Sequence, residues 1–548
     1  MGGDCVLKKI GIKNVRSLEN TGMIQLAPIT LLVGENSSGK STFLRTFPLI
    51  KQSISKRTDG PILWAGDIDD YVDFGSFKET ITKGDINKSM VFTFSFSLKS
   101  DNVPMSLYYY LSPLKSENEN SSIDIIYSIV IDQKDGKEFV SKVDVSLNEV
   151  KIEVFPDSSD EGRDCYKIGD ITFLGEETKQ ERGSEPRTYW EYLNRTTRNF
   201  PSIFGFKLPA ISHHLKKIKE QFPVKETKKG PNNIEPEVVF YKMGELLCRS
   251  IDIEEIPKHF FGESKTLSTN RARNSTESYI SDFIKEYKGY PPSKKKQTDG
   301  LLSLCFFYYL FPQIDEYIDS YFRRVHYIAP LRATAERYYR LRNLAIDEVD
   351  YQGKNLAIFL NSLTGTQLID FQTWTLEHFG FKTVIASKEG HISVKIALKD
   401  NAIEVNLSDT GFGYSQILPI ITQLWELTSP KNENRKREES TPLVIAIEQP
   451  ELHLHPAMQT KLAEVFIASI KRARENGREL QLLLETHSQT IVNYFGVSIA
   501  RKYIQSDDIV TVLFNKDLKT GSTSVSTSAF DEDGHLINWP LGFLAPGE

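Results

Sequence analysis

Cysteine is scarce in this chain, and the few cysteines are far apart. The 548 residues contain Cys5, Cys165, Cys248 and Cys305, and no C-x-x-C spacing occurs. The N-terminus also lacks a basic segment followed by an apolar one, which is the mark of a secretory leader. Together these absences indicate reduced, buried thiols in a cytoplasmic protein rather than a disulfide framework.

Long apolar runs and an excess of positive charge are missing as well. The longest apolar run, residues 301–311, is too short to cross a bilayer, so we expect no contact with a membrane. The formal net charge is −6. This excludes a generally basic nucleic-acid coat, and any contact with nucleic acid must come from a local patch.

What the sequence does contain is a phosphate-binding loop near its N-terminus. An apolar run at 29–33 is followed by G-x-x-x-x-G-K-S, with Gly34, Gly39, Lys40 and Ser41 in the four fixed positions. The glycines let backbone N–H groups point at phosphate oxygens, the lysine neutralises the β- and γ-phosphates, and the serine hydroxyl ligates Mg²⁺. The following helix directs its positive end at the same anions. We therefore predict that ATP and Mg²⁺ bind here, with contacts from Gly34, Asn36, Ser37, Ser38, Gly39, Lys40, Ser41 and Thr42.

Three further elements follow more than 350 residues later. The segment L-S-D-T-G-F-G-Y-S-Q at 407–416 leads into an apolar helix and predicts a second anion site at a helix N-terminus. An apolar run at 443–447 ends in Glu448, and a carboxylate at a strand end beside a phosphate loop is what Mg²⁺ requires. A third apolar run, 482–484, leads to E-T-H-S, where His487 can reach a γ-phosphate or an attacking water.

Each of these elements has an ordinary alternative when it is taken alone. The first fits a common helix cap, and the third fits a loop histidine. His453 and His455 invite a metal site, but no third ligand stands near them in the sequence, which argues against zinc. The order and spacing of the elements favour one nucleotide site.

The order of strands and helices predicts an α/β fold, and the family that this layout resembles has its ATPase head divided by a long insert. Residues 1–155 form its N-terminal half, with an antiparallel β layer indicated by the clean alternation at 91–98. Residues 156–324 form a mainly helical insert with lysine clusters at 216–219, 225–229 and 294–296. Residues 325–548 form the C-terminal half, in which strands and helices alternate.

This layout resembles the ABC-type ATPase heads of structural-maintenance, recombination-repair and overcoming-lysogenization proteins, that is, the SMC, RecF and OLD types. Five motifs narrow the resemblance: E-Q-P-E-L-H-L-H-P, G-F-G-Y-S-Q-I-L-P, A-P-L-R, E-T-H-S and W-P-L-G-F. With these motifs the chain resembles the AAA15-like ATPases of anti-phage defence operons. The nearest group is the PtuA-type ATPases of Septu systems, some of which are attached to retrons.

The resemblance implies roles for particular residues. It makes Glu448 the Walker B acid and a Mg²⁺ ligand together with Ser41, and His487 the switch histidine. The segment 453–455 would lie at the seam of a head dimer. A signature loop that closes over the nucleotide of a second subunit would comprise Gly411, Gly413, Ser415 and Gln416.

The resemblance also implies partners. Heads pair as a homodimer or a higher oligomer, a partner HNH nuclease of the PtuB type cleaves nucleic acid, and retron-linked systems add a reverse transcriptase with its RNA or DNA. No nuclease module is expected in this chain, because only about 60 residues follow E-T-H-S.

Two departures from the family pattern qualify these expectations. Gln449 stands where many such heads have a glutamate that polarises the attacking water. Because an amide cannot accept that proton, we expect slow turnover, or a role for Glu451 in its place. The glutamine lid between the lobes has no clear counterpart, and residues 73–77 are the best candidate. Two other functions stay open: a DNA-repair ATPase, suggested by the basic insert, and a non-hydrolysing ATP-bound scaffold, suggested by Gln449.

Overall fold

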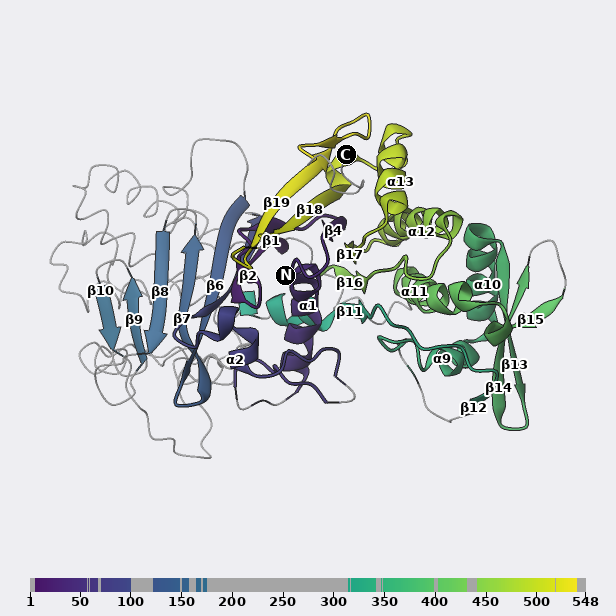
Figure 1. Ribbon diagram of the computed structural model, residues 1–548, viewed down its shortest axis with the longest axis horizontal. Coiled ribbons are helices and arrows are strands. Elements are labelled where there is room, and N and C mark those ends of the chain that lie inside the picture. The colour runs from purple at the N-terminus through teal and green to yellow at the C-terminus, as the bar shows by residue number, and fades with distance from the viewer. Residues whose placement is uncertain are drawn as a thin grey trace, which may run out of the picture.

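The computed structural model describes residues 5–99, 122–174, 314–430 and 441–539, apart from short gaps inside these ranges. Most of the predicted insert, including its lysine clusters, lies outside the described residues. The described parts form a head with three sheets, and helices gather at the side opposite the largest sheet (Figure 1).

A seven-stranded sheet forms the centre of the head, in the order β11-β16-β17-β4-β18-β19-β20. The strands from β11 to β18 run parallel, β19 pairs antiparallel with β18, and β20 pairs antiparallel with β19. Because β4 lies between β17 and β18, segments from opposite ends of the chain meet at the phosphate loop. The strands are β11 (Val325–Ile328), β16 (Leu443–Glu448), β17 (Leu480–Glu485), β4 (Ile29–Gly34), β18 (Ile509–Lys516), β19 (Thr523–Phe530) and β20 (Leu536–Ile537).

An antiparallel sheet of nine strands packs beside this centre, in the order β10-β9-β8-β7-β6-β5-β1-β2, with β3 paired to β1. Alternate side chains of β5, among them Phe92, Phe94 and Phe96, are buried, as period-two strands require. The strands are β1 (Cys5–Val15), β2 (Leu18–Asn20), β3 (Ile24–Gln25), β5 (Met90–Lys99), β6 (Ser122–Lys134), β7 (Lys137–Leu147), β8 (Val150–Pro156), β9 (Asp164–Ile168) and β10 (Ile171–Leu174).

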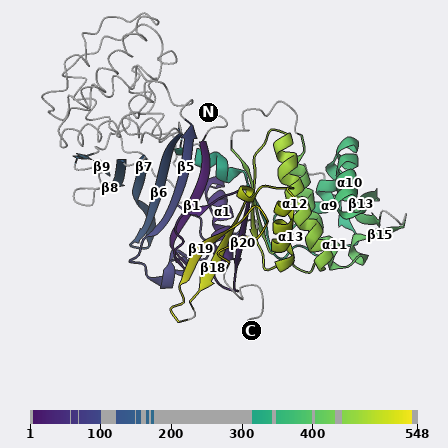
Figure 2. The same ribbon diagram turned by 90° about the horizontal axis from the view of Figure 1, so that it is seen from above.

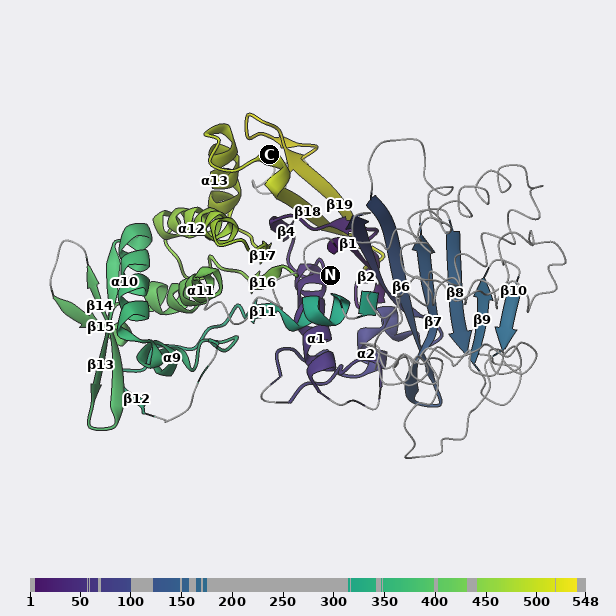
Figure 3. The same cartoon turned by 180° about the vertical axis from the view of Figure 1, so that it is seen from behind.

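The helices cover the central sheet on both faces. Helix α1 lies between it and the antiparallel sheet, whereas α11, α12 and α13 cover the other face (Figures 2 and 3). A small sheet of β12 (Tyr339–Arg340), β13 (Phe381–Lys388), β14 (His391–Leu398) and β15 (Glu404–Asn406) lies beyond α10. The helices are α1 (Lys40–Ser55), α2 (Phe77–Thr80), α9 (Leu356–Ser362), α10 (Gly365–Phe379), α11 (Phe412–Thr428), α12 (Pro456–Glu475), α13 (Gln489–Ala500) and the short η1 (Thr82–Gly84), η6 (Leu407–Asp409) and η8 (Ser506–Asp508).

Side chains of the central strands pack into two separate hydrophobic cores, one on each face of the sheet. In β17, Leu483 packs into the core shared with α1 and the antiparallel sheet, whereas Leu482 and Leu484 pack into the core shared with α11, α12 and α13. Strands β4, β16 and β17 are buried at every position, as expected when both faces of a parallel sheet are covered. Burial on both faces holds the strand ends, and the loops that follow them, in fixed positions.

The predicted α/β class and antiparallel β subdomain are confirmed. Two details differ from expectation. The antiparallel sheet continues past residue 155 through β9 and β10, which pair by backbone hydrogen bonds. The polar composition of this stretch suggests a boundary instead. The small sheet of β12–β15 interrupts the expected alternation in the C-terminal half. No helix among the described residues combines the length and apolar character needed to span a bilayer.

Candidate functional site

The phosphate loop joins β4 to α1 in the conformation that its glycines predict. A side chain on Gly34 would collide with the carbonyl oxygen of Phe514, and one on Gly39 would meet Leu18. Ser37 and Gly39 have positive φ angles of 60° and 96°, a region that glycine tolerates best. The loop therefore curls tightly, and α1 begins at Lys40 with its N-terminus directed toward the curl.

Lys40 is held at the loop before any nucleotide arrives. Its side chain is buried, and Nζ donates to the carbonyl oxygens of Gly34 at 3.0 Å and Glu35 at 2.6 Å. Burial lowers the pKa of Lys40, and the negative charges of Glu485, Glu451 and Glu35 act in the opposite direction. A phosphate oxygen at the loop could accept the hydrogen bonds that Lys40 now donates to these carbonyls.

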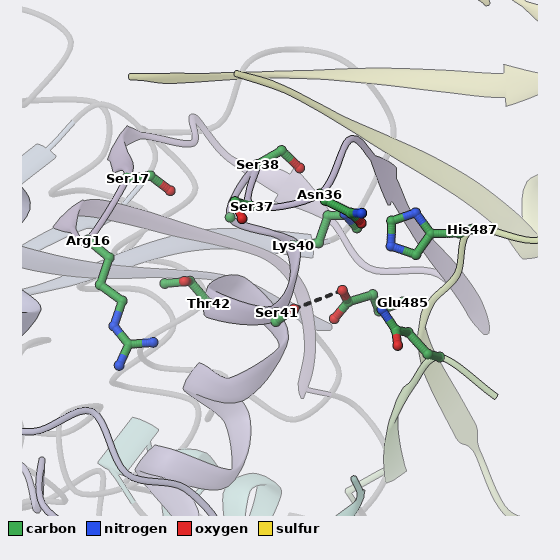
Figure 4. A pocket seen from close by; sticks show the side chains of 12 residues that line it. Arg16, Ser17, Asn36, Ser37, Ser38, Lys40, Ser41, Thr42, Glu485 and His487 are labelled. Atoms are coloured by element: carbon green, nitrogen blue, oxygen red, sulfur yellow. Dashed lines mark hydrogen bonds between the residues drawn. The ribbon is translucent and has the colours of Figure 1, made fainter. Parts of the chain in front are cut away.

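Distant parts of the chain converge on one cavity of about 300 Å³ beside this loop. Figure 4 shows the phosphate-loop side chains facing Glu485 and His487 across it. Of the predicted phosphate contacts, all except Gly34 line the cavity, and Gln449 and His487 line it as expected. The full lining is Arg16, Ser17, Asn36, Ser37, Ser38, Gly39, Lys40, Ser41, Thr42, Gln449, Glu485 and His487.

The carboxylate that faces Ser41 is Glu485, which the sequence analysis did not single out. Ser41 Oγ donates to Glu485 Oε1 at 2.8 Å, and the other oxygen, Oε2, is buried with no hydrogen-bond partner among the described residues. Burial and, after it, the charge of Glu448 raise the pKa of Glu485, and Ser41, Lys40 and Arg45 lower it, so that the pKa is about 7. The sequence does contain a pattern that indicates Glu485, because it ends an apolar run just as Glu448 does.

The serine hydroxyl and this carboxylate fit a magnesium ion bound with a nucleotide. Both are oxygen ligands of the hard type that Mg²⁺ prefers, and the second carboxylate oxygen lacks a partner. Ser38 Oγ is likewise buried without a partner among the described residues, at the loop position where phosphate oxygens would lie. These unsatisfied groups match the donors and acceptors of a magnesium–nucleotide complex.

Glu448, the predicted Walker B acid, lies one strand further away and is engaged elsewhere. Arg45 on α1 donates to it twice, from Nε at 2.6 Å and from Nη2 at 2.7 Å. Tyr327 on β11 donates its hydroxyl at 2.7 Å. The Glu448 side chain is 2% exposed and does not line the cavity. Its role as a metal ligand stays a prediction, and the sequence analysis missed both Arg45 and Tyr327.

The turn after β16 is held by Arg332, the last residue of the A-P-L-R motif. Its Nη2 donates to the carbonyl oxygens of Glu448 at 3.0 Å and Gln449 at 3.4 Å. Gln449 has a φ of 42°, a left-handed conformation that costs about 1 kcal/mol or more in a residue other than glycine. Burial lowers the pKa of Arg332 to about 10, so the guanidinium stays charged and fixes this turn at the edge of the cavity.

Glu451 acts on the histidine loop rather than in the cavity. Its Oε1 accepts the backbone N–H of His487 at 2.6 Å, and Glu451 is not among the residues that line the cavity. Burial raises the pKa of Glu451. Burial and the charge of Lys40 lower the pKa of His487, so its imidazole is neutral near pH 7. The geometry thus places Glu451 as a support for the His487 loop, and its role as a substitute for Gln449 stays a prediction.

The predicted signature residues do not reach the cavity of their own chain. Ser415 and Gln416 are buried; Ser415 Oγ donates to the carbonyl of Phe412 at 2.8 Å, and Gln416 Nε2 donates to that of Arg332 at 3.4 Å. At the start of α11, Gly411 has a φ of 83° and Phe412 is 61% exposed. Gly411 and Phe412 are therefore exposed, whereas Ser415 and Gln416 are turned inward.

Two neighbouring features also have defined places. The ring of His453 lies 6.0 Å from that of Phe412, so the predicted seam loop and the signature segment share one face. His455 caps α12 by accepting the N–H of Ala457 at 3.3 Å. The candidate lid at 73–77 is not part of the cavity wall; Ser76 caps α2, and Phe74 and Phe77 are buried in the core.

The raised pKa of Glu485 makes the stability of the nucleotide-free chain depend on pH. Folding favours the protonated form, so the stabilisation is complete below the unfolded pKa and is lost as the pH rises through the folded value, about 7. We expect the melting temperature of the wild type to fall, relative to that of Glu485→Gln, between about pH 5 and pH 8, because the amide does not ionise. Thermal melts of both proteins across this range measure the difference, and parallel curves would contradict it.

The family model described as an AAA ATPase domain matches residues 6–492. None of the curated proteins matches the chain. Among solved structures, the SMC head domain from Thermotoga maritima aligns with a TM-score of 0.31 and 11% identity, over 95% of this chain and 98% of that one.

Proposed function

The chain belongs to the AAA ATPase domain family and is a nucleotide-hydrolysing ATPase, and from that premise we propose a more specific role. Two copies pair through their heads around ATP and control a partner HNH nuclease of the PtuB type in an anti-phage defence complex. Systems attached to a retron add its reverse transcriptase and nucleic acid. The motifs shared with PtuA-type ATPases, above all E-Q-P-E-L-H-L-H-P and G-F-G-Y-S-Q-I-L-P, support this choice of system.

The separation of the signature segment from the cavity is the observation that carries the head-pairing proposal. The segment 411–413 starts helix α11 at the surface, and the residues that line the cavity do not include it. A helix N-terminus can bind an anion, and because this one does not line its own cavity, we take the nucleotide that it would contact to be that of another molecule. A second copy would bring this segment over the phosphate loop of the first.

The residues of the cavity define what each head does. The backbone of the phosphate loop and Lys40 hold the phosphates, and Ser41 with a neighbouring carboxylate holds Mg²⁺, which neutralises charge on the β- and γ-phosphates. Gln449 can orient a water but cannot accept its proton. Neutral His487 can accept or donate one hydrogen bond at the far side of the cavity. This set fits slow, regulated hydrolysis.

Phe412→Asp tests the pairing of heads without touching the cavity. We expect ATP-dependent dimerisation to weaken at least about tenfold, because a carboxylate would have to be desolvated in the contact. Light scattering with a non-hydrolysable ATP analogue measures it. Ile369→Asp is the matched control, since Ile369 is 65% exposed on α10 and Phe412 is 61% exposed. Equal dimerisation of the Phe412→Asp variant and the wild type would contradict the proposal.

Phage challenge tests the biological role. In cells that carry the chain with its neighbouring genes, Phe412→Asp should abolish protection, while Ile369→Asp should preserve it. Undiminished protection by Phe412→Asp would count against a defence role that depends on paired heads. Tight, salt-sensitive binding of duplex DNA by the purified chain alone would instead favour a DNA-repair ATPase.

A further inference from the structure

Two buried glutamates end adjacent strands of the central sheet. Glu448 on β16 and Glu485 on β17 are register partners, and each is 2% exposed. Two such carboxylates so close together cannot both stay charged without compensation. Their surroundings differ sharply, and the difference indicates separate tasks.

The negative charge of Glu448 is compensated by partners within the protein. It accepts two hydrogen bonds from the guanidinium of Arg45, at 2.6 and 2.7 Å, and one from the hydroxyl of Tyr327, at 2.7 Å. A two-point contact between a guanidinium and a carboxylate is among the strongest pairings in proteins. It ties α1 to β16 and, through Tyr327, to β11. The contacts of the Glu448 carboxylate thus hold α1, β16 and β11 together.

Glu485 is placed differently. Because β17 is the direct neighbour of β4, Glu485 pairs with Leu32, two residues before Gly34, and its side chain reaches the start of α1. One of its oxygens accepts the Ser41 hydroxyl at 2.8 Å, and the other is buried with no hydrogen-bond partner among the described residues. Figure 4 shows this carboxylate directed into the cavity beside Ser41. A buried, unpartnered carboxylate oxygen next to a hydroxyl ligand calls for a cation.

We infer that Glu485, rather than Glu448, is the protein carboxylate that holds the Mg²⁺ of bound MgATP beside Ser41. Glu448 instead acts as a structural anion for Arg45. The acid therefore comes from the strand next to the phosphate-loop strand, the one that also carries His487. This assignment rests on the proposed function, since it requires that the cavity bind MgATP.

The test compares nucleotide affinity with and without magnesium. A fluorescent, non-hydrolysable ATP analogue is titrated into each protein in Mg²⁺ and in EDTA, and the ratio of the two affinities is the readout. We expect Glu485→Gln to reduce this ratio at least about tenfold, to a value near that of Ser41→Ala, while its affinity in EDTA stays close to the wild-type value.

The variant at Glu448 provides the contrast. Glu448→Gln alone leaves Arg45 without its anion, so the readout is taken from the double variant Arg45→Met/Glu448→Gln, which removes both charges. We expect this protein to keep the wild-type ratio. The assignment is overturned if the double variant loses the magnesium-dependent affinity ratio while Glu485→Gln keeps it. It is also overturned if both proteins lose the ratio equally or both keep it. If the wild type binds no nucleotide in either buffer, the proposed function itself fails.

Discussion

Replacing Lys40 with alanine is expected to weaken ATP binding about a hundredfold or more. Lys40 is 3% exposed, and among the described residues its ammonium donates to the carbonyls of Gly34 and Glu35 in the phosphate loop. Charge-assisted hydrogen bonds of this kind contribute about 1.5–3 kcal/mol each, and 1.4 kcal/mol is a factor of ten in affinity. Titration with a fluorescent ATP analogue measures the loss, and ATP turnover should fall in parallel.

Helix α1 offers a matched control for this change. Lys51 is also buried, at 8% exposure, and its Nζ donates to the carbonyl of Val325 at 2.6 Å, but it does not line the cavity. Lys51→Ala should lower the melting temperature while leaving ATP affinity within about twofold of wild type. Equal loss of affinity in the two variants would mean that Lys40 acts through folding rather than through phosphate contact.

The difference between what the sequence predicted and what it missed follows from distance along the chain. The phosphate loop could be predicted because its glycines, Lys40 and Ser41 act within one turn, so their spacing is also their geometry. The same holds for β5, whose alternating residues face one core. The apolar runs that became β16 and β17 were equally plain.

Which carboxylate meets Ser41 depends instead on the order of strands in the sheet. Both Glu448 and Glu485 end buried runs, and only the placement of β17 beside β4 selects Glu485. Arg45 looks like an ordinary surface position of an amphipathic helix until β16 is packed against it. The inward turn of Ser415 and Gln416 likewise depends on how α11 sits against its lobe. Such long-range pairings are not encoded in local spacing.

The second large effect concerns the anchor beneath the site. Arg45→Ala is expected to destabilise the head by about 3 kcal/mol, because breaking one side of a buried ion pair leaves an uncompensated charge. The charge left without its partner would be that of Glu448, whose side chain is 2% exposed, whereas the side chain of Arg45 is 33% exposed. Of the donors to that carboxylate in the described part of the chain, the hydroxyl of Tyr327 would remain. A drop of several degrees in melting temperature is the expected reading.

The loss should come from the unpaired charge rather than from the missing side chain, and two controls separate these causes. Arg45→Met/Glu448→Gln removes both charges and keeps an acceptor for Tyr327, so most of the stability should return. Arg323→Ala removes an exposed pair with Asp319, whose side chains are 50% and 37% exposed, and should cost no more than about 0.5 kcal/mol. If Arg45→Ala melts no lower than Arg323→Ala, the pair does not hold α1 to β16. The structural role assigned to Glu448 would then be contradicted.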